Sequence, residues 1–144
     1  MNTSQMWERF SEEYGVKCEY DAWAFGDDPD GLANLVLEGT KTGTSSAYDL
    51  YALEGEKLPK EGGYSVILDS RDEAVCVIKT VKVYVTPFNK VSADHAFKEG
   101  EGDRSLEYWR AVHKSFFEVE FAGTGVKFDE NTLVVCEEFE VVYR

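Results

Sequence analysis

Basic residues are scarce in this sequence. Its 144 residues carry 28 Asp and Glu against 15 Lys and Arg, a formal net charge of −13 at pH 7. Proteins that coat nucleic acids bind through Lys and Arg side chains that neutralise phosphates, so this charge argues against a protein that binds long DNA or RNA. A small site for a nucleoside, a single flipped base or a short RNA stays compatible with it.

Cysteine pairs and metal-binding motifs are also lacking. Cys18, Cys76 and Cys136 lie far apart and form no CxxC pair, which excludes a zinc knuckle or a thioredoxin-type motif. Cys76 and Cys136 lie in apolar runs, where a thiol behaves as a small hydrophobe, and a cysteine nucleophile is a minor alternative. Residues 26–31 resemble a calcium loop, but Leu37 stands where a bidentate Glu is required. We therefore expect no metal and no cofactor.

Long apolar runs and nucleotide-binding motifs are missing too. No run approaches the roughly 18 apolar residues of a membrane span, and residues 1–15 lack the apolar core of a signal peptide. Thr40 precedes Lys41 where the GxxxxGK[ST] phosphate loop needs Gly, and neither GxGxxG nor GxSxG occurs. These absences predict a cytoplasmic protein with no membrane partner. We expect one domain over 1–144 with a helical extension at about 1–15, and the oligomeric state stays open.

The chain is rich enough in apolar residues to form a packed core. Hydrophobic residues make up 43% of it and aromatic residues 14%, too many for a disordered chain. Residue periodicity and turn residues predict helices over 3–14, 28–38, 45–54, 92–97 and 105–117, and strands over 18–25, 64–69, 74–86 and 133–143. Because helices and strands mix without a regular βαβ rhythm, we predict an α+β fold: a small, mostly antiparallel sheet or barrel with helices around it.

Residues 37–46 place one lysine, Lys41, among four hydroxyl side chains. These are Thr42, Thr44, Ser45 and Ser46. A lysine held against hydroxyls in a partly enclosed site can lose its proton and act as a base, and a hydroxyl beside it can become a nucleophile. The alternative interpretation is a helix that ends at Gly39, followed by a polar turn with Lys41 in water.

The acidic segment that contains Glu99 and Glu101 is a second candidate. Alternating carboxylates between glycines would raise one another's pKa if they lie close together, whereas the alternative is a solvated loop. Trp109 and His113 are four residues apart on one helical face, which suits either base stacking with hydrogen bonding or core packing. Arg110 is either a surface charge or an anion clamp.

Several of these motifs together resemble one known family. The spacing Gly39-x-Lys41-x-x-Thr44 at the end of a helix, before a β-rich middle region, resembles the ASCH domain family. Further matching segments are a turn into a strand at 58–63, the acidic element at 96–106, a Trp-Arg-x-x-His element at 109–113 and a final strand at 133–142. The order and spacing of these elements is more specific than the lysine motif alone.

The resemblance implies a PUA-like β-barrel with helices on its outside and a cleft between the lysine turn and the acidic loop. The family was proposed to bind RNA; some members hydrolyse the amide of N4-acetylated cytidine, and some are reported to cleave RNA. The catalytic residues of the amidohydrolase members fall on Lys41, Thr44 and Glu99, with Glu101 as the fallback. Expected substrate-binding residues are Ser45, Ser46, Trp23, Tyr48, Trp109, Arg110 and His113.

The sequence thus predicts an amidohydrolase for a small acylated nucleobase or nucleoside. In this hypothesis Lys41 is held neutral by partial burial and takes the proton of Thr44, which attacks the acyl carbonyl. Glu99 orients Lys41 or water and passes a proton to the leaving amine. The alternatives are a non-catalytic module that binds a nucleotide or short RNA, and a ribonuclease that uses the same cleft.

Overall fold

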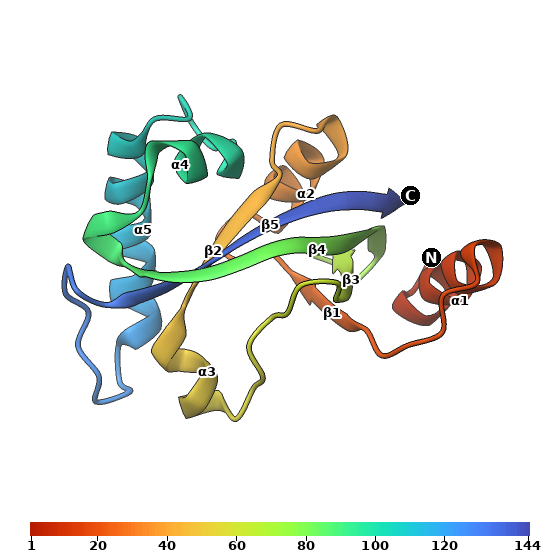
Figure 1. Ribbon diagram of the computed structural model, residues 1–144, viewed down its shortest axis with the longest axis horizontal. Coiled ribbons are helices and arrows are strands. Elements are labelled where there is room, and N and C mark those ends of the chain that lie inside the picture. Colours follow the sequence, from red (N-terminus) through yellow and green to blue (C-terminus); the bar gives the residue numbers. More distant parts are fainter.

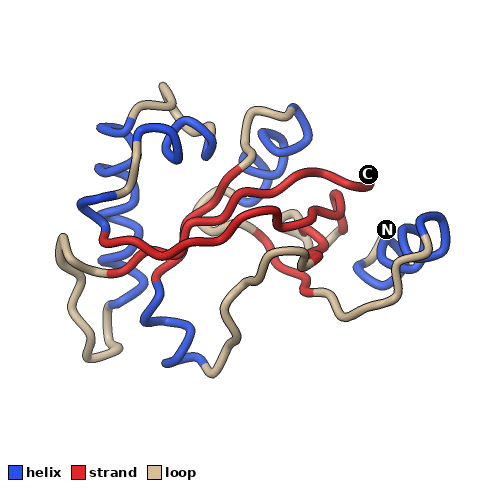
Figure 2. The backbone as a smooth tube through the Cα atoms, viewed as in Figure 1, coloured by secondary structure: helices blue, strands red, loops and turns tan.

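The computed structural model describes all residues from 1 to 144. Helices and strands follow each other without a regular alternation (Figure 1, Figure 2). The elements are α1 (Thr3–Tyr14), β1 (Asp21–Ala24), α2 (Pro29–Glu38), β2 (Gly43–Ala47), α3 (Tyr48–Glu54), β3 (Tyr64–Leu68), β4 (Ala74–Pro87), a 3-10 turn η1 (Phe88–Lys90), α4 (Ala93–Glu99), α5 (Leu106–Phe121) and β5 (Leu133–Tyr143).

The five strands form one sheet in the order β1-β3-β4-β5-β2. Only the β1–β3 pair is parallel, and the other neighbours are antiparallel. Shifts of register between β4 and β5, at Val77/Ile78 and Thr80/Lys82, bend the two longest strands. The sheet therefore curls into a half-barrel with helices around it, and the predicted α+β, PUA-like barrel fold is confirmed (Figure 1).

Helices cover the sheet in three places, each with its own apolar core. Helices α4 and α5 pack at the end of the sheet formed by β2 and β5, where Phe117 is fully buried. Helix α2 places Val36 against Ile67 of β3, whereas α1 places Phe10 against Val66 of the same strand. Because neighbouring residues of a strand point to opposite faces, α1 and α2 cover opposite faces of the sheet.

The helix boundaries follow the capping signals of the sequence. The Asp28 side chain caps α2 by accepting from the Gly31 N–H, and Pro29 begins the helix, as predicted. Ser105 caps α5 in the same way. Helix α1 instead starts from a capping box at Asn2, one residue before the expected cap. None of the helices combines the length and apolar character that crossing a bilayer requires.

Two predicted elements need correction. The helix predicted over 45–54 is wrong in its first part, because residues up to Ala47 form strand β2 and the helix begins at Tyr48. Pairing with β5, in which Ser45 lies opposite Cys136, favours the strand, and that partner is 91 residues away along the chain. The strand predicted over 18–25 is shorter, Asp21–Ala24, because only these residues pair with β3.

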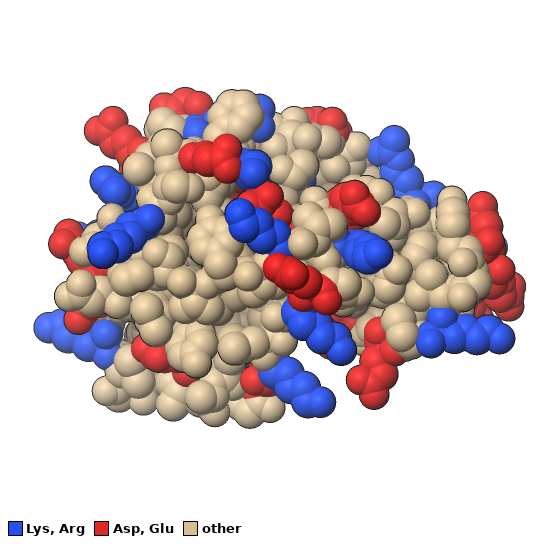
Figure 3. Space-filling view, in the orientation of Figure 1, with Lys and Arg blue, Asp and Glu red and all other residues tan.

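Charged side chains of both signs are interspersed over the face shown in Figure 3. Lys and Arg form no continuous patch on this face, and acidic groups lie beside most of them. Proteins that track a nucleic-acid backbone present a basic stripe or groove. This face therefore offers no such track.

Candidate active site

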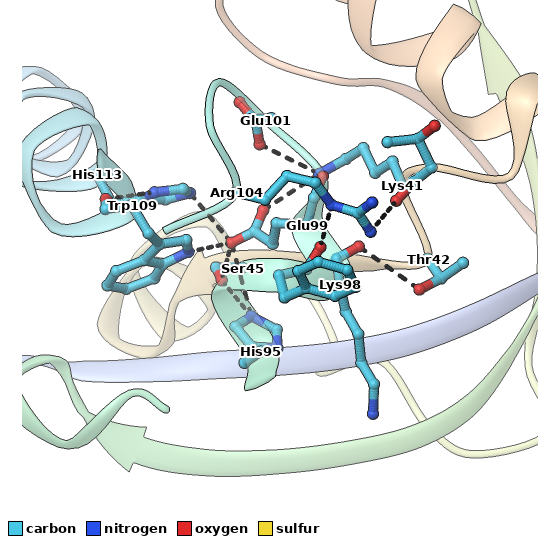
Figure 4. Close-up of polar contacts among 12 residues, drawn as sticks. Lys41, Thr42, Ser45, His95, Lys98, Glu99, Glu101, Arg104, Trp109 and His113 are labelled. Carbon is cyan, nitrogen blue, oxygen red and sulfur yellow. Dashed lines mark hydrogen bonds and ion pairs between the residues drawn. The ribbon is translucent and has the colours of Figure 1, made fainter. Parts of the chain in front are cut away.

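Lys41 is the centre of a buried polar cluster (Figure 4). Gly39 ends α2 in the left-handed conformation, with φ of 82°, and the Lys41 N–H then donates to the Leu35 carbonyl at 3.1 Å. This turn directs the lysine side chain inward, where 1% of it is exposed. Its Nζ lies 3.1 Å from Oε1 of Glu99 and 3.3 Å from Oε2 of Glu101, and so bridges the two carboxylates.

The C-terminus of α4 holds the acidic segment against the lysine turn. Gly100 ends the helix with φ of 74°, and a Cβ added there would lie 2.5 Å from the Thr40 carbonyl oxygen. Glycine is therefore needed both for the backbone conformation and for the close approach. The Thr42 N–H donates to the Lys98 carbonyl at 2.7 Å. These main-chain contacts fix the position of Glu99 relative to Lys41.

The Glu99 carboxylate is 2% exposed and contacts five donor side chains. These are Lys41 Nζ on Oε1 at 3.1 Å and, on Oε2, Ser45 Oγ at 2.6 Å, His113 Nε2 at 3.2 Å, His95 Nε2 at 3.6 Å and Trp109 Nε1. Burial alone would raise the pKa of Glu99, but the charges of Lys41 and His113 together with the hydrogen bonds outweigh it and hold the pKa well below its usual value. Glu99 is therefore an ionised group at neutral pH.

His113 and Trp109 form one stacked unit beside Glu99. Their rings lie 4.3 Å apart and nearly parallel, which confirms that the two residues share a helical face. His113 Nδ1 is 2.9 Å from the Trp109 carbonyl oxygen, so both ring nitrogens face acceptors. Burial alone would lower the pKa of His113, but the charge and hydrogen bond of Glu99 outweigh it and raise the pKa. The protonated ring satisfies both acceptors at once.

Ser45 lies between Glu99 and His95, with Oγ 2.6 Å from Glu99 Oε2 and 2.7 Å from His95 Nε2. An ionised carboxylate only accepts, so Ser45 donates to Glu99 and accepts from the His95 Nε2–H. In this arrangement no base is left to take the Ser45 proton, because His95 is the donor and the pKa of Glu99 is lowered. Ser45 therefore braces Glu99 and does not act as a nucleophile.

The cluster reaches solvent at Glu101, whose side chain is 20% exposed. Arg104 ties this segment down by donating to the Phe97 carbonyl at 3.1 Å and the Thr40 carbonyl at 3.3 Å. Its guanidinium also stacks on the Phe97 ring at 3.6 Å from the centroid. Glu101 is thus the more exposed of the two carboxylates that contact Lys41.

Glu99, Glu101 and His113 place possible metal-ligating atoms within 4.8 Å of one another. The Lys41 ammonium, however, already bridges both carboxylates. His113 presents N–H groups to Glu99 and to the Trp109 carbonyl, so its lone pair is not available. A divalent cation would have to displace the ammonium and deprotonate the imidazole, and the donor set therefore fits a metal poorly.

The model of the ASCH domain family matches residues 21–143. The chain belongs to the ASCH domain family. A crystal structure of the protein EF3133 from Enterococcus faecalis V583 is 38% identical with a TM-score of 0.91, and the alignment covers 99% of this chain and 88% of that one. The crystal structure of an ASCH domain from Lactobacillus crispatus JV V101 is 32% identical with a TM-score of 0.87, over 98% and 94% of the two chains. Helix α1 lies before the family match, but it falls within these nearly complete alignments.

A more distant similarity extends to the hypothetical protein PH0355. That crystal structure is 15% identical with a TM-score of 0.57, over 86% of this chain and 100% of that one, and so shows the fold alone. No curated protein matches the chain.

The threonine of the ASCH lysine motif, Thr44, lies outside the buried cluster. Thr44 and Ser45 are consecutive in β2, so their side chains point to opposite faces of the sheet. No hydrogen bond joins the Thr44 hydroxyl to Lys41, Glu99 or Glu101. Ser46 lies on the same face of β2 as Thr44, away from the cluster, and its hydroxyl is 2.7 Å from the Tyr51 hydroxyl. The expected site residues of this ASCH domain therefore divide between two faces.

The predicted aromatic and basic ligand contacts are mostly elsewhere. Trp23 packs edge-on against Phe25 at 4.9 Å, Tyr48 is 37% exposed on α3, and Arg110 is exposed on α5. None of the three contacts the Lys41 cluster. Trp109 does, and with 2% of its surface exposed it packs in the core, which fits the core-packing interpretation of this residue better than base stacking.

Sequence analysis missed two buried titratable residues of this ASCH domain. His95 had no assigned role, although its spacing of i, i+4 from Glu99 places both on one face of α4. Glu137 lies among several glutamates of the last strand and received no role from the sequence, yet it is buried, and burial raises its pKa to about 7. Its signal was an inward position in an alternating strand, which can be recognised only once the register is known.

A cavity of about 180 Å³ lies beside α3 and α5, away from the lysine cluster. It is lined by Ser46, Ala47, Leu50, Tyr51, Glu54, Glu56 and Glu120. Three glutamates in its wall would repel an anionic ligand, so this cavity does not suit a phosphate group.

Proposed function

We propose that this ASCH domain is an amidohydrolase that acts on a small acylated nucleobase or nucleoside of the N4-acetylcytidine type. The buried bridge from Lys41 to Glu99 and Glu101 carries the proposal. Burying an ion pair costs several kcal/mol per ion, and an apolar pair of similar volume often stabilises a fold as well or better. Buried charges with strongly shifted pKa values concentrate at functional sites. The resemblance to ASCH amidohydrolases supports the same residues.

Lys41 acts in this proposal as an ammonium that relays a proton. Two carboxylates at 3.1 and 3.3 Å stabilise its charged form, so the geometry argues against the neutral lysine that the sequence suggested. The Thr44 proton passes to Nζ while Nζ gives one of its own protons to Glu101. The Thr44 oxygen then bonds to the acyl carbon, the C–N bond breaks, and the proton returns through Nζ to the leaving amine. Water hydrolyses the acyl-threonine ester, which releases the acid and regenerates the hydroxyl.

The two carboxylates have different roles. Glu99 is enclosed by donors and ionised, so it positions Lys41 and does not exchange protons with the substrate. Glu101 has one ion-pair partner and is partly exposed, so it exchanges the proton. Thr44 is half-buried and has no side-chain partner that would hold its proton. Thr44 lies on the other face of β2 from the Lys41 cluster, so the proposed transfer requires this edge strand to change position when substrate binds.

The test is release of cytidine from N4-acetylcytidine, followed by absorbance or chromatography. Lys41→Ala and Thr44→Ala each remove a reacting group and should lower turnover by at least about 100-fold, whereas Thr44→Ser keeps the hydroxyl and should retain most of it. Lys127→Ala, which removes an exposed lysine, is the matched control and should leave turnover unchanged. Absence of turnover by the wild type, or undiminished turnover by both alanine variants, rejects the proposal.

The rival function is binding without chemistry, and salt dependence separates it. A phosphate-bearing ligand such as a short RNA should lose affinity steeply as salt is added, whereas a neutral nucleoside should scarcely respond. Steep salt dependence without turnover would identify a nucleotide-binding module.

A further inference from the structure

Glu137 lies in the middle of β5 and is 7% exposed, but it has almost no partners. It forms no ion pair, and its one side-chain hydrogen bond is a long contact of 3.4 Å from Thr80 Oγ1 to Oε2. Buried polar groups in proteins are nearly always hydrogen-bonded, and a carboxyl group can accept several bonds. Oε1 of Glu137 is therefore a free hydrogen-bonding position in the described chain.

This free oxygen is not fully enclosed by the protein. Only one fully buried polar side-chain atom in the protein lacks a partner, and it is Nδ1 of His95. The unpartnered oxygen of Glu137 is not among the fully buried atoms and therefore keeps some exposed surface. A ligand atom that reached this oxygen would supply the hydrogen bond that the protein does not.

Hydroxyl groups surround Glu137 on its face of the sheet. Thr44 is its direct partner in the β2–β5 register, which places their Cβ atoms about 4.5–5.5 Å apart. Ser46 lies two residues further along the same face of β2, bonded to the Tyr51 hydroxyl of α3. Asp21 of β1 and Tyr51 are the titratable groups whose electrostatic effects couple to Glu137. No cation is among the groups that shift its pKa.

Burial is the main reason that the Glu137 pKa rises to about 7; the Thr80 hydroxyl lowers it slightly, and the charge of Asp21 raises it further. Near neutral pH the group is therefore present in both forms. The protonated form carries an O–H donor next to a C=O acceptor. This pair is complementary to a heterocycle edge that presents an acceptor nitrogen or oxygen beside an N–H donor.

We infer that Glu137, with Thr80 behind it and Thr44 opposite, is a subsite that binds the Watson–Crick edge of a pyrimidine. The inference rests on the proposed function and names the part of the substrate that is recognised. In cytosine, N3 accepts from the carboxyl O–H and the N4–H donates to the carbonyl oxygen. An acyl group on N4 extends from this same edge, so binding at Glu137 brings the acyl carbon toward the Thr44 hydroxyl.

Calorimetric titration of the whole protein with cytidine and 3-methyluridine tests the subsite. Cytidine should bind at about pH 6 and lose about 30-fold in affinity by about pH 8.5, because the carboxyl group ionises and its O–H donor is lost. 3-Methyluridine carries a methyl group on the recognised edge and should bind at least about tenfold more weakly than cytidine at the lower pH. Equal binding of the two nucleosides, or no cytidine binding, overturns the inference.

Two variants at position 137 sharpen this test. Glu137→Gln keeps one donor and one acceptor in the same place, so it should bind cytidine with no pH dependence between these values, whereas Glu137→Ala should lose binding. The matched control is Glu138→Gln. Glu138 is the next residue of β5, points to the opposite face of the sheet from Glu137, and pairs with Lys98 and Lys82. A pH dependence that persists in Glu137→Gln, or full affinity in Glu137→Ala, contradicts the inference.

The subsite and the proposed reaction fail in different ways. Cytidine binding that depends on Glu137, without turnover of N4-acetylcytidine, upholds the subsite and rejects the hydrolase. Turnover with a KM that Glu137→Ala leaves unchanged upholds the hydrolase and rejects the subsite.

Discussion

Glu99 and Glu137 are buried carboxyl groups on opposite faces of the same sheet, and their pKa values shift in opposite directions. Burial acts on both in the same sense and would raise both pKa values. Glu99 has Lys41, His113 and three further donors around it, and its pKa falls. Glu137 has one hydroxyl at 3.4 Å, and its pKa rises to about 7.

The comparison shows that the partners, and not the depth of burial, decide the charge of a buried carboxyl group. Ion pairs and hydrogen bonds outweigh desolvation at Glu99, whereas only the long hydrogen bond from Thr80 opposes it at Glu137. Glu99 therefore keeps a fixed charge and suits positioning. Glu137 changes protonation near neutral pH and suits exchange with a ligand.

The largest effect should come from removing the cation that distinguishes the two sites. Lys41→Met leaves Glu99 buried without its ammonium and should destabilise the fold by about 3–5 kcal/mol, measured as the free energy of unfolding in urea. Glu99 should then resemble Glu137, and its pKa should rise.

Lys98→Met is the matched control for this prediction. Lys98 forms two ion pairs with side chains of Asp94 and Glu138, but it is 34% exposed, so its loss should cost about 1 kcal/mol or less. Equal costs for the two lysine variants would show that the Lys41 bridge contributes no more than a surface pair.

A second prediction uses pH, where the two carboxyl groups act with opposite sign. The pKa of Glu137 is higher in the folded protein than its ordinary value of 4.5, so its contribution to stability is fully present below that value and is lost as pH rises through about 7. The pKa of Glu99 is lowered on folding, so its contribution is present above the ordinary value and is lost as the solution becomes acidic. Glu137→Gln cannot ionise and should be about 3 kcal/mol more stable than the wild type at about pH 8, with little difference at about pH 4.

Urea unfolding of both proteins over this pH range checks the sign. His113 also loses its contribution as pH rises through its raised pKa, but it does so in both proteins and cancels in the difference. A difference that stays constant with pH, or that grows toward acid, contradicts the assignment of Glu137.

The sequence predicted the mostly antiparallel sheet and the part of the candidate site formed by Lys41, Glu99 and Glu101. Caps such as Asp28 and Ser105 are local signals, so helix starts followed from neighbouring residues. The family motif placed Lys41 and the acidic segment near each other, and their contact follows from α4 meeting the lysine turn. The strand at 43–47 could not be predicted, because small hydroxyl residues carry no strong local preference and only β5 stabilises it there.

The sequence also did not predict that Thr44 and Ser45 lie on opposite faces of the sheet. Once 43–47 is a strand, Thr44 and Ser45 must point to opposite faces, whereas a turn or helix would have allowed both to approach Lys41. The same change of element pairs Thr44 with Glu137, which sequence spacing alone could not connect. One misassigned element therefore explains both the misplaced Thr44 and the missed Glu137.

The smallest expected effect compares the two serines that follow Thr44 on β2. Ser45 donates a hydrogen bond to the ionised Glu99, so Ser45→Ala should cost about 1.5–3 kcal/mol of unfolding free energy. Ser46 shares a neutral hydrogen bond with Tyr51 on the other face, so Ser46→Ala should cost about 0.5–1.5 kcal/mol. Because both changes remove one hydroxyl from the same short strand, differences in strand propensity largely cancel. A larger cost at Ser46 than at Ser45 would mean that Glu99 does not depend on its hydroxyl donor, and that Lys41 and the histidine–tryptophan pair alone hold its charge.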